Sequence, residues 1–240
     1  MLKLSEKEEE IELAKKNAAM RAVEENLKNN TILGVGSGST IVHAVKRVAE
    51  IIREKKWDIK CIPTSFQAYQ LIMEHGLNYT TLDRHPIIDL DIDGADEIDQ
   101  DLNLIKGGGG CLVQEKIIAS NSKKVIIVAD YRKVSTRLGE NWKKGIPIEI
   151  IPMAATPILK KIEQMGGCPS LRMARAKMGP VITDNGNFIL DVNFGEIKDP
   201  AKLEKELNTI PGVIENGIFS NVVKALYMGN ADGSIKTFFN

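Results

Sequence analysis

Short apolar runs alternate with amphipathic segments along the first 145 residues. Apolar side chains recur at helical spacing over 6–28, where Ser5 and Glu8 also match a capping box. The apolar runs expected to form buried strands lie at 31–35, 58–62, 87–92 and 124–129. The helices predicted between these strands cover 41–50, 65–75 and the segment after Gly110. Strands separated by helices predict an α/β fold with a wound, mainly parallel sheet and helices on both faces.

The pattern changes after residue 145. Prolines interrupt and end the apolar run at 146–152, and shorter segments follow. The segments predict helices at 155–165 and 200–207, with strands at 171–176, 188–192 and 213–218. Two further runs, 222–227 and 234–238, predict a hairpin that returns to the main sheet. We therefore predict an α/β domain made of 1–145 and 219–240, with a smaller α+β domain, 146–218, inserted in it.

The composition narrows the classes of protein that the chain can represent. Its 240 residues include 32 basic and 32 acidic side chains and 5% aromatic residues, which argues against a general nucleic-acid binder. No apolar run approaches the ~20 residues of a membrane span, and the N-terminus lacks the apolar core of a signal peptide. Three scattered cysteines indicate reduced thiols. We expect a cytoplasmic protein without nucleic-acid or membrane partners.

A glycine- and serine-rich loop joins the first predicted strand to the next helix. The loop is Gly36-Ser37-Gly38-Ser39-Thr40. Loop amides and a helix N-terminus can face an anion, and the hydroxyls of Ser37, Ser39 and Thr40 can donate as well. No Gly-Lys-[Ser/Thr] follows, and the dinucleotide fingerprint fits poorly. The loop favours a monophosphate, and a simple strand–helix turn is the alternative.

The segment from Asp93 to Glu115 carries the densest chemistry. Asp93 ends a predicted strand, Asp96 follows it, and Lys106 precedes four consecutive glycines. Glycines let the backbone approach a ligand, and their successive N–H groups can bind an oxyanion. Glu115, in the first turns of a predicted helix, can transfer protons, as can the two aspartates. Together these features predict a site for an anionic sugar rather than a surface loop.

Metal chemistry is weakly supported. The three histidines, His43, His75 and His85, lack ligand spacing and a nearby cysteine pair, so no zinc site is expected. Asp93, Asp96 and Glu97 can bind a divalent cation, but Lys106 would compete with it. We predict no metal and no organic cofactor.

Six segments, in order along the chain, resemble the type A family of ribose-5-phosphate isomerases. They are GVGSGST at 34–40, DGADEID at 93–99, KGGGGCLVQEK at 106–116, IIPMA at 150–154, VITDNGN at 181–187 and IPGVIENGIF at 210–219. The resemblance spans essentially the whole chain. KGGGGC and the segment PTSFQA at 63–68 look more like the eukaryotic branch than the bacterial one.

The resemblance implies a reaction and a set of site residues. Members interconvert D-ribose 5-phosphate and D-ribulose 5-phosphate in the pentose phosphate pathway, without a metal or organic cofactor, as homodimers or homotetramers. Glu115 is then the proton-transferring base of a cis-enediolate mechanism, and Asp93, Asp96 and Lys106 are the candidates for opening the sugar ring. The implied substrate contacts are Ser37, Gly38, Ser39, Thr40, Asp93, Gly94, Ala95, Asp96, Lys106, Gly107, Gly108, Gly109, Lys133 and Lys16.

Two other readings stay open at this point. A sugar-phosphate sensor could use the same loop, although binding alone does not require Glu115 and two aspartates. Another enzyme on a related fold, an amino-sugar phosphate deaminase-isomerase or an acyl-CoA transferase, is the second alternative. The lack of a catalytic-looking histidine disfavours the deaminase, and a coenzyme A ester tested as substrate would identify the transferase.

Overall fold

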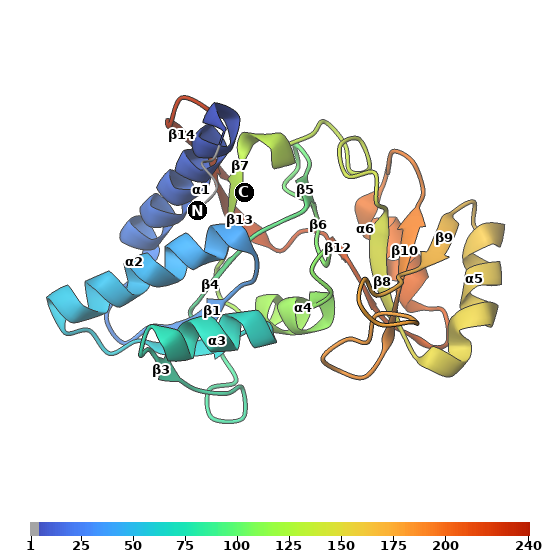
Figure 1. Ribbon diagram of the computed structural model, residues 1–240, viewed down its shortest axis with the longest axis horizontal. Helices are drawn as coiled ribbons and strands as arrows, with labels where there is room; N and C mark the ends of the chain where they lie inside the picture. The colour runs from blue at the N-terminus through green and yellow to red at the C-terminus, as the bar shows by residue number, and fades with distance from the viewer. Residues whose placement is uncertain (1–4) are drawn as a thin grey trace. The chain divides into compact units, whose positions relative to one another are not determined.

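The computed structural model describes residues 5–240, which pack into two compact units (Figure 1). Unit 1 comprises the residues up to Ala95, Ile117–Lys133 and Val222–Asn240. Unit 2 comprises Asp96–Lys116 and Val134–Asn221. The domain boundaries expected at 146 and 219 stay a prediction.

Within residues 5–240, the sheet of unit 1 has seven strands in the order β14-β13-β7-β4-β1-β2-β3. The strands are β1 (Ile32–Val35), β2 (Lys60–Pro63), β3 (Asn78–Tyr79), β4 (Leu90–Asp93), β7 (Val125–Asp130), β13 (Val223–Gly229) and β14 (Ile235–Phe239). Neighbouring strands run parallel except β13 and β14, which are antiparallel. The wound, mainly parallel sheet and the C-terminal hairpin at its edge are thus confirmed.

Helices cover both faces of this sheet. The helices of this region are α1 (Glu6–Asn26), α2 (Ser39–Lys55), α3 (Phe66–Glu74) and α4 (Leu112–Ser120). Successive strand residues point to opposite faces. Cys61 accordingly joins the core beneath the first three helices, whereas Ile62 packs with Ile118 of α4. The predicted α/β layering is therefore confirmed.

Small side chains let α1 lie close to the sheet. Ser5 caps the helix with the capping box expected from the sequence. The inward face carries alanines that are fully buried: Ala14, Ala18, Ala19 and Ala22. A methyl group added to Gly229 of β13 would overlap the carbonyl oxygen of Ala14. Close packing at this point thus requires a glycine on the strand.

Unit 2 contains two small antiparallel sheets within the described residues. The larger has the order β11-β8-β10-β9, and the smaller has the order β12-β6-β5. The strands are β5 (Glu97–Ile98), β6 (Leu104–Ile105), β8 (Ile146–Ile150), β9 (Cys168–Leu171), β10 (Phe188–Asn193), β11 (Val213–Asn216) and β12 (Ile218–Phe219). The helices α5 (Ala155–Gln164) and α6 (Pro200–Asn208) bury Ile158, Ile162 and Leu207 in the same core as the larger sheet.

One strand of unit 2 lies earlier than predicted. The expectation of a strand at 171–176 was wrong, because β9 ends at Leu171. Pro169 lies inside β9, and proline suits this position since β9 is at the edge of its sheet. The residues after Leu171 instead form a loop closed by a bridge between Met173 and Pro180.

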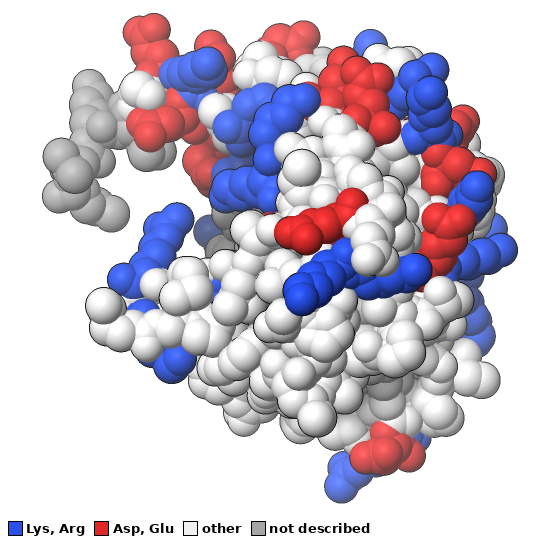
Figure 2. Space-filling view, turned by 90° about the vertical axis from the view of Figure 1, so that its right-hand side faces the viewer, with Lys and Arg blue, Asp and Glu red and all other residues white. Residues whose placement is uncertain are grey.

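Charged side chains of both signs are visible from the side that carries α5. Figure 2 looks onto the side that carries α5, and it shows Lys, Arg, Asp and Glu gathered above a large uncharged area. Lys160, Lys161 and Glu163 are exposed on that helix.

None of the helices within residues 5–240 is long and apolar enough to cross a membrane.

Candidate active site

The predicted phosphate loop connects β1 to α2 in unit 1. Gly38 is the N-cap of α2 and has a φ of 100°, a conformation that favours glycine. The N–H of Gly38 donates to Gln67 Oε1 at 2.9 Å. The Ser37 hydroxyl lies 2.9 Å from Thr64 Oγ1 and 2.6 Å from Ser65 Oγ. The loop is thus braced by the segment after β2, a contribution that motif spacing alone did not reveal.

The N-terminus of α2 is suited to binding an anion. Ser39 begins this 17-residue helix and is exposed, and Thr40 is half-buried. The first amides of a helix lack intrahelical partners and carry the positive end of the helix dipole. Together with the hydroxyls, they are the kind of donors that bind a phosphate, and phosphate binding at this loop stays a prediction.

Asp93 holds the same loop through hydrogen bonds to its backbone. It is 1% exposed at the carboxyl end of β4, and its Oδ1 accepts hydrogen bonds from the N–H groups of Ser37 (3.0 Å) and Gly94 (2.7 Å). A methyl group at Gly36 would overlap that oxygen. The carboxylate therefore shapes the predicted phosphate loop.

Lys133 ends η1 (Tyr131–Lys133), which directly follows β7. In this sheet β7, β4 and β1 are neighbours and run parallel, so Lys133, Asp93 and the phosphate loop follow the same edge. Beside Lys133, burial raises the pKa of Asp130, but the Arg132 guanidinium outweighs it and lowers that pKa below its ordinary value. Lys16 is exposed on α1, and its role stays a prediction.

A buried ion pair lies at the start of α4 in unit 2. Lys106 Nζ donates to Glu115 Oε1 at 3.0 Å, and the two side chains are only 4% and 6% exposed. Lys106 Nζ also lies 5.6 Å from the centroid of the Phe219 ring. Removing one partner of such a pair leaves an uncompensated charge. Lys106 and Glu115, which the sequence singled out separately, thus form an ion pair that the sequence alone did not show.

The glycine loop between these two residues is held at several points. The N–H of Gly108 donates to Asp96 Oδ2 at 2.6 Å, and the N–H of Gly110 donates to the Gly107 carbonyl at 2.9 Å. Gly107 and Gly110 have φ values of 92° and 86°, which favour glycine. Asp96 therefore lies against the glycine loop, and its predicted contact with a substrate stays a prediction.

Glu97 has a different environment from Asp96. It is fully buried, and its carboxylate accepts hydrogen bonds from the N–H groups of Gly139 and Asn141, both at 2.6 Å. Glu97 thus holds the loop that precedes β8, which accounts for its burial without a cation.

Arg172 and its partner Asp191 lie beside the glycine loop, and no motif in the sequence pointed to either residue. Arg172 Nη1 donates to the carbonyl oxygens of Gly107 (3.1 Å) and Gly108 (3.2 Å). Its Nε and Nη2 pair with Asp191 at 2.8 and 2.5 Å. Arg172 lies 65 residues from Gly107, so no local motif connects them, and the strand predicted at 171–176 gave Arg172 no special place.

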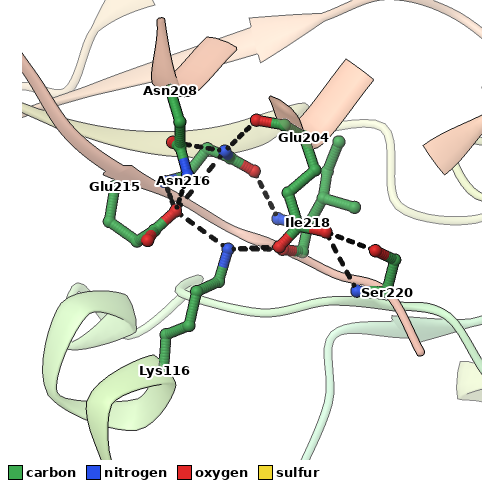
Figure 3. A network of polar contacts seen from close by, with 7 residues as sticks. All are labelled: Lys116, Glu204, Asn208, Glu215, Asn216, Ile218 and Ser220. Carbon is green, nitrogen blue, oxygen red and sulfur yellow. Dashed lines mark hydrogen bonds and ion pairs between the residues drawn. The ribbon is translucent and has the colours of Figure 1, made fainter. Parts of the chain in front are cut away.

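Lys116, next to Glu115, anchors the beginning of α4 (Figure 3). Its Nζ donates to Glu204 Oε1 (2.8 Å), Glu215 Oε1 (2.9 Å) and the carbonyl of Ile218 (2.6 Å). Glu204 also accepts from the Ser220 hydroxyl. Asn208 and Asn216 complete the network. Since consecutive helix residues lie about 100° apart around the axis, this anchor fixes the direction in which Glu115 projects.

Comparisons with known proteins show the family of this chain. Residues 60–233 match the family model of ribose 5-phosphate isomerase A (phosphoriboisomerase A). The chain is 56% identical to a ribose-5-phosphate isomerase of Sus scrofa over 225 residues, which cover 93% of this chain and 74% of that protein.

Two solved structures share the fold. Ribose 5-phosphate isomerase A from Methanocaldococcus jannaschii matches with a TM-score of 0.88 and 41% identity, over 94% of this chain and 98% of that one. A D-ribose-5-phosphate isomerase in complex with phospho-erythronic acid matches with a TM-score of 0.90 and 41% identity, over 94% of this chain and 97% of that one. This chain belongs to the ribose 5-phosphate isomerase A family.

Proposed function

We propose that this chain interconverts D-ribose 5-phosphate and D-ribulose 5-phosphate through a cis-enediolate, with Glu115 as the base. The observation that carries the proposal is the buried Lys106–Glu115 pair beside the glycine loop. The pair combines a carboxylate that can move a proton with a cation that can stabilise a developing oxyanion. The family assignment supports an isomerase rather than a sensor or a transferase.

Proton transfer is proposed for Glu115. Its carboxylate takes the C2 proton of the open-chain aldose, and the electron pair of that C–H bond forms the C1–C2 double bond of the enediolate. As that double bond forms, the carbonyl electron pair moves onto O1. The proton of the C2 hydroxyl then passes to O1, and the protonated Glu115 returns its proton to C1 while the C2–O bond becomes the carbonyl of the ketose. A positioned base of this kind contributes roughly 10²–10⁴-fold in rate.

Stabilisation of the enediolate oxygen is proposed for Lys106 and the amides of Gly107, Gly108 and Gly109. Donors fixed in advance are each worth on the order of 3 kcal/mol, because they need not reorganise during the reaction. Lys106 already donates to Glu115, so it can follow the charge as that charge moves from carboxylate to substrate.

Phosphate binding is proposed for Ser37, Gly38, Ser39 and Thr40, with Lys133 and Lys16 as further cations. The complex of a 41%-identical relative with phospho-erythronic acid, a phosphorylated sugar acid, supports a sugar phosphate as the ligand. Binding the phosphate orients the reacting carbons at the other end of the substrate.

Ring opening is proposed for a group among Asp93, Asp96 and Lys106, with Gly94 and Ala95 contributing contacts to the substrate. Asp96 accepts one hydrogen bond from Gly108, so its second oxygen is the better candidate for a proton transfer to the sugar. Activity without metal, a role in the pentose phosphate pathway, a cytoplasmic location and a homodimeric or homotetrameric state belong to the same proposal.

The test is the conversion of ribose 5-phosphate to ribulose 5-phosphate by purified protein in EDTA. Glu115→Gln keeps the shape of the side chain but removes the base, so turnover should fall about 10²-fold or more with a modest change in KM. Glu163→Gln, on the exposed surface of α5, is the matched control and should behave as wild type. Near-normal turnover in Glu115→Gln would reject Glu115 as the base. Activity lost in EDTA and restored by Mg²⁺ would show that a metal is required.

A further inference from the structure

Both backbone polar groups of Arg172 are hydrogen-bonded to neighbouring segments of the chain. It directly follows β9, its N–H donates to the Ile189 carbonyl, and its own carbonyl accepts from the N–H of Val181, both at 2.8 Å. The side chain is 17% exposed, as is that of Asp191. A guanidinium fixed in this way can impose geometry on whatever it contacts.

The guanidinium divides its donors between two partners. Nε and Nη2 form a bidentate pair with Asp191, which sets the plane of the fork. Nη1 is then directed at two successive carbonyls of the glycine loop, Gly107 at 3.1 Å and Gly108 at 3.2 Å. The pair with Asp191 already balances the charge of Arg172, so the hydrogen bonds to the loop carbonyls are additional contacts that affect the loop itself.

This effect on the loop follows from peptide geometry. In a trans peptide the C=O and the N–H of the same group point in opposite directions. Turning the Gly107 and Gly108 carbonyls toward Arg172 therefore turns the amides of Gly108 and Gly109 away from it. The Gly108 amide does point at an anion on that side, since it donates to Asp96.

We propose that Arg172 is a positioning residue for the isomerisation, which holds the Gly109 amide toward the enediolate oxygen and the Gly108 amide against Asp96. The inference rests on the proposed function and deepens it. Glycines have the widest conformational freedom of all residues, so four in succession need an external restraint to keep two donors aligned. The positive charge behind the carbonyls also polarises both peptide groups, which strengthens their N–H donors.

The experiment compares Arg172→Gln and Arg172→Lys with wild type. Arg175→Gln, three residues further along and exposed, is the matched control. We measure kcat, KM, thermal unfolding, and the affinities for inorganic phosphate and for phospho-erythronic acid, whose carboxylate mimics the negative charge of the enediolate. Arg172→Gln should lower kcat about 10–100-fold while KM changes less than about threefold.

The affinity for phospho-erythronic acid should fall in step with kcat/KM, and that for inorganic phosphate should stay constant. Arg172→Lys, which keeps the charge but loses the fork, should recover part of kcat. Asp191→Asn, which frees the fork to rotate, should show a smaller loss of the same kind and serves if Arg172→Gln does not fold.

Two results would overturn the inference. Arg172→Gln with an unchanged kcat per folded molecule, even with a lower melting temperature, would show that Arg172 only stabilises the fold. Equal losses of affinity for phosphate and for phospho-erythronic acid would show a general distortion. An active wild type with either result rejects only the role of Arg172, whereas a wild type that does not isomerise ribose 5-phosphate rejects the proposed function as well.

Discussion

Gly36 and Asp93 restrict each other at the start of the phosphate loop. The Asp93 carboxylate occupies the space that a side chain at position 36 would need. There it accepts hydrogen bonds from the N–H groups of Ser37 and Gly94. Neither residue can change without moving the loop. The close approach between β4 and the loop thus sets the shape of the proposed phosphate site, together with the hydrogen bonds from the segment after β2.

Gly36→Ala should therefore weaken substrate binding. Overpacking of this kind costs about 1–3 kcal/mol, and the loop amides shift with the carboxylate. We expect KM for ribose 5-phosphate to rise about tenfold or more, measured by steady-state kinetics. Gly166→Ala is the control, because its methyl meets nothing within 4 Å although its φ of 86° is strained. A wild-type KM in Gly36→Ala would contradict the proposed geometry of the loop.

The three cysteines should differ sharply in reactivity. Burial raises the pKa of Cys61 to about 12, and the thiolate is the reactive form. Cys111 is also buried, whereas Cys168 is exposed on β9. Iodoacetamide at pH 8 should label Cys168 well before the others, as followed by mass spectrometry of the native protein. Labelling of Cys61 at a comparable rate would mean that unit 1 opens readily; labelling in denaturant is the control.

At the scale of elements, α4 depends on a polar anchor. Lys116 is the cation opposite Glu204 and Glu215, and these three side chains are 14–21% exposed. The network ties the helix that carries Glu115 to α6 and β11 (Figure 3). An anchor of this kind stabilises the fold and at the same time directs the side chain that we propose as the base.

Lys116→Met should lower the free energy of unfolding by about 2–4 kcal/mol, because it leaves two carboxylates facing each other without their cation. Chemical denaturation measures this change. Lys123→Met is the matched control: its ion pair with Asp89 is 64% and 37% exposed, so about 1 kcal/mol or less is expected. Equal effects in the two variants would show that the network around Lys116 contributes no more than a surface pair.

The sequence predicted long elements well and short ones poorly. The helix expected at 6–28 is α1, and the buried run at 124–129 is β7, because both patterns repeat over enough residues to be recognised. The two-residue strands β5, β6 and β12 show no periodicity, and their pairing is decided by distant partners. The bounds of β9 also depend on its place in the sheet, because an edge strand can contain a proline such as Pro169.

The candidate site divides in the same way. Asp93, Lys106 and Glu115 lie in motifs dense enough to identify from the chain alone. Their contacts were not predictable: the Lys106–Glu115 pair needs the path of the glycine loop, and Arg172 reaches that loop only through the pairing of β9 with β10.

On the scale of the whole molecule, the chain passes between the two units at 95–96, 116–117, 133–134 and 221–222. In unit 2, the two central strands of the larger sheet, β8 and β10, both come from the continuous segment Val134–Asn221. Unit 1 instead needs a strand from near the end of the chain, since β13 lies between β7 and β14.

This order has a consequence for the nascent chain on the ribosome. β7 ends at residue 130 and its partner β13 begins at residue 223, about 90 residues later. At 5–20 residues per second, β7 waits roughly 5–20 s with one edge unpaired. An unpaired edge of buried, apolar residues is a template for aggregation. The sheet that carries the proposed phosphate loop is therefore the last part of the protein to close during synthesis, and the free edge of β7 is exposed to aggregation while it waits.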